Sequence, residues 1–169
     1  MGAAYQELRY SVRDSPAVYT DDRGWKVGGE NAHLMAFDTD QATVYQVRPR
    51  HRHQEVQEVI PRNYQGVMVT DRGRSYEDKS FRRVKQRKCL AHLQRTLSDV
   101  LAHKKGRARD LAEGTREVLR IGVWLWEEYH WGSREEFDHW VPEVRWGLSY
   151  YLRDRPLKDQ DNQKVLGML

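Results

Sequence analysis

The stretch VYTDDRGWKVGGENAHLMAF, residues 18–37, decides the fold. It begins with a short apolar segment, places Asp21 and Asp22 directly after it, and reaches a second apolar segment beyond two adjacent glycines. Apolar segments on either side of a glycine turn predict two antiparallel strands, at residues 17–20 and 33–37. The two acidic residues are then either turn residues or metal ligands at the end of a strand.

Strand and helix patterns continue on the C-terminal side of this stretch. ATVYQV, residues 42–47, predicts a third strand and so a three-strand meander. HQEVQEVI, residues 53–60, has apolar residues at helical spacing and ends at a proline. GVMVT, residues 66–70, is a nearly continuous apolar run, which is typical of a strand in a parallel sheet. VKQRKCL, residues 84–90, predicts a fifth strand.

A right-handed crossover through the helix would place the fourth strand beside the first. Asp71 directly follows the fourth strand, so it would lie next to Asp21 at the carboxyl ends of two parallel strands, where open sheets bind ligands. Two close carboxylates repel each other unless they share a proton or hold a cation. Oxygen ligands select Mg²⁺ or Mn²⁺, which suit phosphoryl transfer by a two-metal site. The alternative is that both aspartates belong to ordinary turns.

The composition indicates a folded protein. The chain has 169 residues, 38% of them hydrophobic, which is enough for a core. We expect neither a membrane span nor a secretory signal, since no apolar run is long enough for the first and the N-terminus lacks the pattern of the second. The single cysteine, Cys89, excludes an internal disulfide and fits a reducing cytoplasm.

Positive charge is concentrated in the middle of the chain. Residues 72–109 contain 13 basic and 3 acidic side chains. Such a block attracts polyanions, nucleic acid first among them, although a solvated helix face is the alternative. We expect the phosphate contacts to come from side chains near the fifth strand and the helix after it: Lys85, Arg87, Lys88, His92 and Arg95.

From Leu93 onward, apolar stripes at helical spacing predict helices. Trp126 and Trp140 fall on these stripes, so we expect both in the core, while other tryptophans could stack on bases. Ser133 with Glu136 predicts a helix N-cap, and Pro142 predicts a new helix or a kink.

Three segments, in order, resemble motifs of bacterial DDE transposases of the insertion sequence 66 family. TDDRGWKVGGENAHLMAF resembles the first acidic motif, YQGVMVTDRGRSY the second, and QRKCLAHLQR the Cys-x-Ala-His block after it. The resemblance implies a ribonuclease H-like fold: α/β, with a mixed sheet of a three-strand antiparallel meander plus parallel strands, and a C-terminal helical extension. It implies that Asp21 and Asp71 are the first two catalytic carboxylates, that they hold Mg²⁺ or Mn²⁺, and that transposon DNA is cut and joined. A homodimer is a possible assembly.

The sequence also departs from this family. The third motif, a glutamate in an Asn-Asn-x-x-Glu context, has no match, and Arg23 and Arg72 lie beside the aspartates where smaller residues are usual. We therefore expect a catalytic core over residues 1–92 and a helical insertion over residues 93–169 that stops before the third carboxylate, with little activity alone. The alternatives are a non-catalytic nucleic-acid-binding module with the same fold, or a ribonuclease H-like nuclease that uses another acidic residue of the helical region.

Other residues could serve as metal or DNA ligands. Cys89 and His92 have the spacing of half a zinc site, but no second pair follows. His51 and His53 flank an arginine, and we expect a solvated loop there rather than a ligand pair. We expect Trp25 to pack under the first hairpin rather than to touch DNA.

Overall fold

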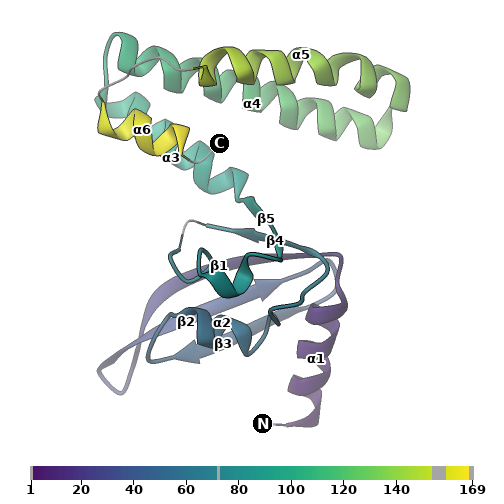
Figure 1. Ribbon diagram of the computed structural model, residues 1–169, viewed down its shortest axis with the longest axis vertical. Helices are drawn as coiled ribbons and strands as arrows, with labels where there is room; N and C mark the ends of the chain where they lie inside the picture. The colour runs from purple at the N-terminus through teal and green to yellow at the C-terminus, as the bar shows by residue number, and fades with distance from the viewer. Residues whose placement is uncertain (1, 72, 154–158, 168–169) are drawn as a thin grey trace. The chain divides into compact units, whose positions relative to one another are not determined.

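The computed structural model describes residues 2–71, 73–153 and 159–167 of the chain (Figure 1). The chain divides into two compact units, Met1–Cys89 and Leu90–Leu169. The sequence-based boundary, between residues 92 and 93, lies slightly further along. The first unit contains the sheet, and the second is helical.

The first unit is a five-stranded mixed sheet with short helices. Its strands lie in the order β3-β2-β1-β4-β5. The pairs β1–β2 and β2–β3 are antiparallel, whereas β1–β4 and β4–β5 are parallel. The predicted α/β class, with its meander and added parallel strands, is therefore confirmed. The elements are α1 (Ala3–Asp14), β1 (Ala17–Val27), β2 (Glu30–Asp38), β3 (Thr43–Arg48), α2 (His53–Gln57), β4 (Val67–Thr70), η1 (Lys79–Phe81) and β5 (Lys85–Lys88).

The first hairpin is longer than the sequence predicts. Gly28 and Gly29 have φ angles of +59° and +89°, which only glycine adopts readily, and they form a two-residue turn between β1 and β2. β1 runs through both acidic residues, where Asp21 pairs with Ala36 and Asp22 with Met35. The two aspartates are thus strand residues, and the turn interpretation is excluded for them.

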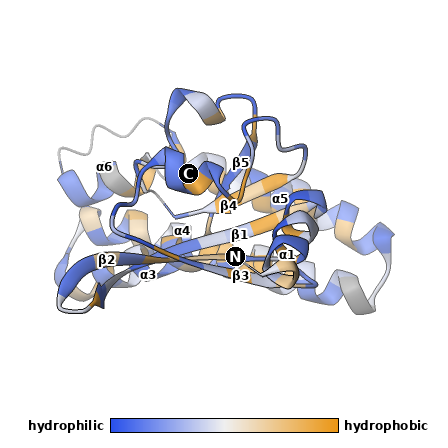
Figure 2. Ribbon diagram, turned by 90° about the horizontal axis from the view of Figure 1, so that it is seen from below, coloured by the Kyte–Doolittle hydropathy of each residue, from blue (hydrophilic) through white to orange (hydrophobic). Residues whose placement is uncertain are grey.

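The sheet has two different faces. On one, the covered face, residues from α1 and α2 pack on the strands and close the core, which contains Val12, Val18, Met35, Phe37, Val44, Val56, Val59, Ile60 and Met68. On the other, the open face, Tyr19 is 54% exposed and Tyr45 is 60% exposed. β4 is largely hydrophobic and lies between β1 and β5 (Figure 2). Its burial alternates, with Met68 buried and Val67 and Val69 only half-buried, so it is not buried on both faces as its apolar run predicts. Because strand side chains alternate, consecutive residues of β1 face opposite ways.

The second unit contains α3 (Leu90–His103), α4 (Arg107–Trp131), α5 (Arg134–Leu152) and α6 (Gln160–Leu166). The Ser133 hydroxyl caps α5 by accepting a hydrogen bond from the Glu136 amide, as predicted. Pro142 lies inside α5, so the expectation of a new helix there is wrong. The core prediction for Trp126 and Trp140 is also wrong, since they are 53% and 51% exposed. None of the helices described is both long and apolar enough to cross a membrane.

Candidate functional site

The parallel register places the two predicted catalytic residues at corresponding positions, just beyond the last pair that joins β1 to β4. β1 and β4 pair through Tyr19 and Val69, and Asp21 and Asp71 each lie two positions beyond that pair. The crossover that sets this register contains α2. Asp21 is exposed and Asp71 is half-buried.

Tyr76 is a buried tyrosine whose side chain interacts with the candidate carboxylates. Burial raises the pKa of Tyr76 well above its usual value, and the negative charges of Asp22, Asp71 and Asp21 raise it further. The phenol stays neutral at physiological pH and adds no further negative charge to this edge.

Local hydrogen bonds orient the two carboxylates. Asp71 Oδ1 accepts a hydrogen bond of 2.8 Å from the Gly73 amide. This bond forms the turn that the sequence analysis gives as the alternative to a metal-binding role for Asp71. Asp21 Oδ1 accepts one of 3.0 Å from the Asp22 amide. A Cβ at Gly73 would lie 3.0 Å from Asp71 Oδ1 and 3.2 Å from the Tyr76 ring, so this turn suits glycine. Arg72 lies outside the described residues.

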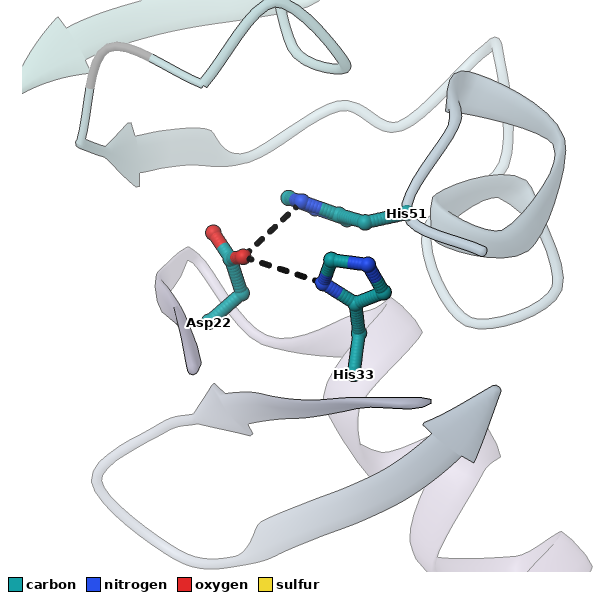
Figure 3. A group of neighbouring side chains, drawn as sticks. All are labelled: Asp22, His33 and His51. Atoms are coloured by element: carbon teal, nitrogen blue, oxygen red, sulfur yellow. Dashed lines mark ion pairs between the residues drawn. The ribbon is translucent and has the colours of Figure 1, made fainter. Parts of the chain in front are cut away.

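A second cluster lies on the covered face, and the sequence analysis did not predict it. Asp22 from β1, His33 from β2 and His51 from the loop before α2 present ligand atoms that all lie within 4.8 Å of one another (Figure 3). The expectation that His51 is solvated is wrong, since its side chain is only 10% exposed and its Nδ1 lies 3.0 Å from Asp22 Oδ2. His53 lies 3.4 Å from Asp78 through its Nδ1. The sequence contained one sign of this cluster: His33 lies in a predicted strand, two positions before the apolar residue Met35 and therefore on the same face.

The predicted DNA-contacting side chains differ in their surroundings. Lys85 and Arg87 are exposed on β5 and, by their pairing with Val67 and Val69, share the open face. Lys88 faces the other way and forms an ion pair of 3.3 Å with Glu77. Arg95, on α3 of the second unit, is exposed.

The sequence analysis also considered three further residues as metal or DNA ligands. Cys89 is a free thiol, and its backbone amide donates to the carbonyl of Thr70. Half-buried His92 lies in the first turn of α3. Trp25 is 49% exposed, so it does not pack under the hairpin as expected.

A mixed sheet that places acidic residues of two adjacent parallel strands just beyond their last paired residues is the architecture expected of a DDE-type transposase core. The chain belongs to the IS66 family of transposases, whose family model matches residues 1–127. This confirms the family indicated by the three sequence motifs.

Two structures of the HTLV-2 integrase catalytic core domain in complex with magnesium are similar to part of the chain. The trimeric form has a TM-score of 0.37 and 13% identity, covering 51% of this chain and 68% of the integrase chain. The dimeric form has a TM-score of 0.37 and 12% identity, covering 58% and 83%. No curated protein sequence matches significantly. The family assignment therefore depends on the family model.

Proposed function

We propose that this chain carries part of the metal-dependent active site of a transposase, with Asp21 and Asp71 as carboxylate ligands of Mg²⁺ or Mn²⁺. The observation that supports this most is the register of β1 and β4, which puts these two residues at corresponding positions. The donor set fits such an ion, because carboxylate oxygens are the ligands that Mg²⁺ prefers.

The chemistry supplied at such a site is activation of water or a DNA 3′-hydroxyl and stabilisation of the leaving oxygen at a phosphodiester. The chain's own contribution is to hold the two carboxylates. Asp21 is held within a paired strand, and Asp71 by the hydrogen bond from Gly73. Rigid placement of ligands on paired strands is what a site of this kind requires.

DNA binding is the second part of the proposal. Lys85 and Arg87 lie on β5, the neighbour of β4, and are exposed on the open face, which is the face that Asp21 shares by alternation. Their positive charge would position a DNA backbone near the sheet edge without reading its sequence. The family implies transposon ends as the substrate; a homodimer and a cytoplasmic location remain predictions.

Calorimetry with Mn²⁺ tests the metal ligands. We expect the wild-type chain to bind Mn²⁺ and the Asp71→Asn variant to lose this binding. Asp40→Asn, which changes an exposed aspartate in the β2–β3 turn, is the matched control and should bind as the wild type does. Equal Mn²⁺ affinity in the Asp71→Asn and Asp40→Asn variants would remove the basis of the proposal.

The competing function is a nucleic-acid-binding module without catalysis, which the basic segment favours. Such a module would show a steep salt dependence of DNA affinity but no carboxylate-dependent metal binding. We also expect little or no strand transfer by this chain alone, since the sequence has no match to the family's glutamate motif. Robust Mg²⁺-dependent DNA cleavage by the purified chain would contradict that expectation.

A further inference from the structure

Asp22, His33 and His51 converge on the covered face from three separate segments. Asp22 lies opposite Met35, a core residue, so its side chain points to the covered side of β1. His33 lies two positions before Met35 on β2 and therefore shares that face. His51 enters from the loop between β3 and α2, on the side where α2 packs.

The hydrogen bonding of this cluster is incomplete. Both imidazoles turn Nδ1 toward the same carboxylate oxygen, Asp22 Oδ2, at 3.0 Å from His51 and 3.9 Å from His33 (Figure 3). The distance of 3.9 Å is beyond hydrogen-bond range, so the buried Nδ1 of His33 has no hydrogen-bond partner among the described residues. The Nε2 of His51, on a side chain nine-tenths buried, likewise has none within the part of the chain that the structure describes. Buried polar atoms of this kind normally have a partner.

We propose that Asp22, His33 and His51 form a binding site for a divalent transition-metal ion of the Zn²⁺ type. A tetrahedral ion with ligands at about 2.1 Å holds its ligand atoms about 3.4 Å apart. The separations of Asp22 Oδ2 from the two Nδ1 atoms, 3.0 and 3.9 Å, lie on either side of that value, and all three ligand atoms lie within 4.8 Å of one another. Shifts of about 1.4 Å or less would therefore complete the site.

The ligand set selects this class of ion over Mg²⁺. Imidazole nitrogens suit Zn²⁺, Co²⁺ and Ni²⁺, whereas Mg²⁺ takes oxygen ligands. Two histidines and one carboxylate leave a fourth position for water or an anionic group. The site is therefore chemically distinct from the carboxylate pair Asp21 and Asp71, and it does not depend on the catalytic role proposed for them.

An ion at this position would connect the hairpin to the loop around the second carboxylate. The carbonyl of His51 accepts a hydrogen bond of 3.0 Å from the Ser75 hydroxyl, and its ring packs edge-on to Tyr76 at 5.6 Å between centroids. Both partners belong to the segment that follows Asp71. The ion would thus fix the position of this loop relative to β1.

Titration of the full chain with Zn²⁺ by calorimetry, with Co²⁺ absorption as a second measurement, tests the site. We expect one ion per chain, retained in a large excess of Mg²⁺. His33→Gln and His51→Gln each remove one ligand, and we expect affinity to fall by at least the 10–100-fold seen for loss of an outer-shell partner. His53→Gln is the matched control, because this histidine lies two positions from His51 but pairs with Asp78.

Two further variants separate this site from the proposed catalytic pair. Asp22→Asn should lose Zn²⁺ affinity, whereas Asp21→Asn should change it only a few-fold. Absence of stoichiometric Zn²⁺ binding by the wild-type chain would overturn the proposal, whatever the variants do. Binding that survives both histidine substitutions but is lost in Asp21→Asn would also overturn it, since the ion would then lie at the other carboxylates.

Discussion

Replacing Gly66 by alanine should destabilise the sheet at the entry to β4, the strand that leads to Asp71. A Cβ at this position would overlap the Tyr64 hydroxyl and lie 2.7 Å from the carbonyl oxygen of Pro16. The Pro16 carbonyl is backbone and accepts a 2.9 Å hydrogen bond from the Val67 amide, so it cannot move without disturbing the β1–β4 pair.

The expected loss in the free energy of unfolding follows from these contacts. Displacing Tyr64, which is 4% exposed, breaks its 2.7 Å hydrogen bond to the Ser15 carbonyl, a loss of about 1 kcal/mol. Crowding a packed position costs about 1–3 kcal/mol more. The alanine returns about 0.4–1 kcal/mol by restricting the unfolded chain. We therefore expect a net loss of about 1–3.5 kcal/mol in the free energy of unfolding of the first unit.

Amide hydrogen exchange in a urea series measures this loss locally, in peptides covering β1 and β4. Tryptophan fluorescence would report chiefly on the other unit, because Trp25 is the one tryptophan in residues 1–89. Gly24→Ala is the matched control: a Cβ there meets nothing within 4 Å, so stability should be unchanged or rise by up to about 1 kcal/mol. If both variants exchange alike, the close approach of Gly66 to its neighbours is refuted.

Three further outcomes follow from the described contacts. Arg87→Ala should reduce the slope of log DNA affinity against log salt by about 1, whereas Lys88→Ala, which removes an ion-paired side chain, should change it less in the same binding assay. The pKa of Asp159 is lowered, chiefly by the hydrogen bond from Lys104. The ionised carboxylate therefore stabilises the fold above the unfolded pKa of 3.8, and this stabilisation is lost as the pH falls below that value. In acid unfolding, the stability of the Lys104→Ala variant should depend less on pH below 3.8 than that of the wild type. Met68→Ala should cost about 2–5 kcal/mol in urea unfolding, because the side chain is fully buried.

The sheet order could be predicted from the sequence because local patterns and a chirality rule act together. The apolar run before Asp71 indicated a strand of a parallel sheet, and the rule of right-handed crossovers predicted that it lies beside the first strand, as it does. The length of β1 was underestimated, because Asp-Asp-Arg-Gly is a good turn sequence by itself. Pairing with β2 outweighs that local preference, and the turn forms at Gly28 and Gly29 instead.

The histidine cluster and the tryptophan exposures could not be predicted in the same way. His33 and His51 meet only through the packing of α2 against the sheet, which no local spacing encodes. Periodicity places Trp126 and Trp140 on apolar stripes, but it does not say how much of a stripe a neighbouring helix covers. Both rings are about half exposed, so the apolar stripe is wider than the surface that the neighbouring helix covers.

The register of the first hairpin determines which task each of two adjacent carboxylates can perform. Because side chains alternate along β1, Asp21 faces the open side, which it shares with Lys85 and Arg87, while Asp22 faces the two histidines. A slip of one residue would exchange the two and turn the core residues of β1 toward solvent. The two-residue turn, which pairs Val27 with Glu30, leaves no freedom for such a slip. A two-residue glycine turn that begins six positions beyond Asp22 thereby keeps the proposed carboxylate site and the proposed imidazole site on opposite sides of one strand.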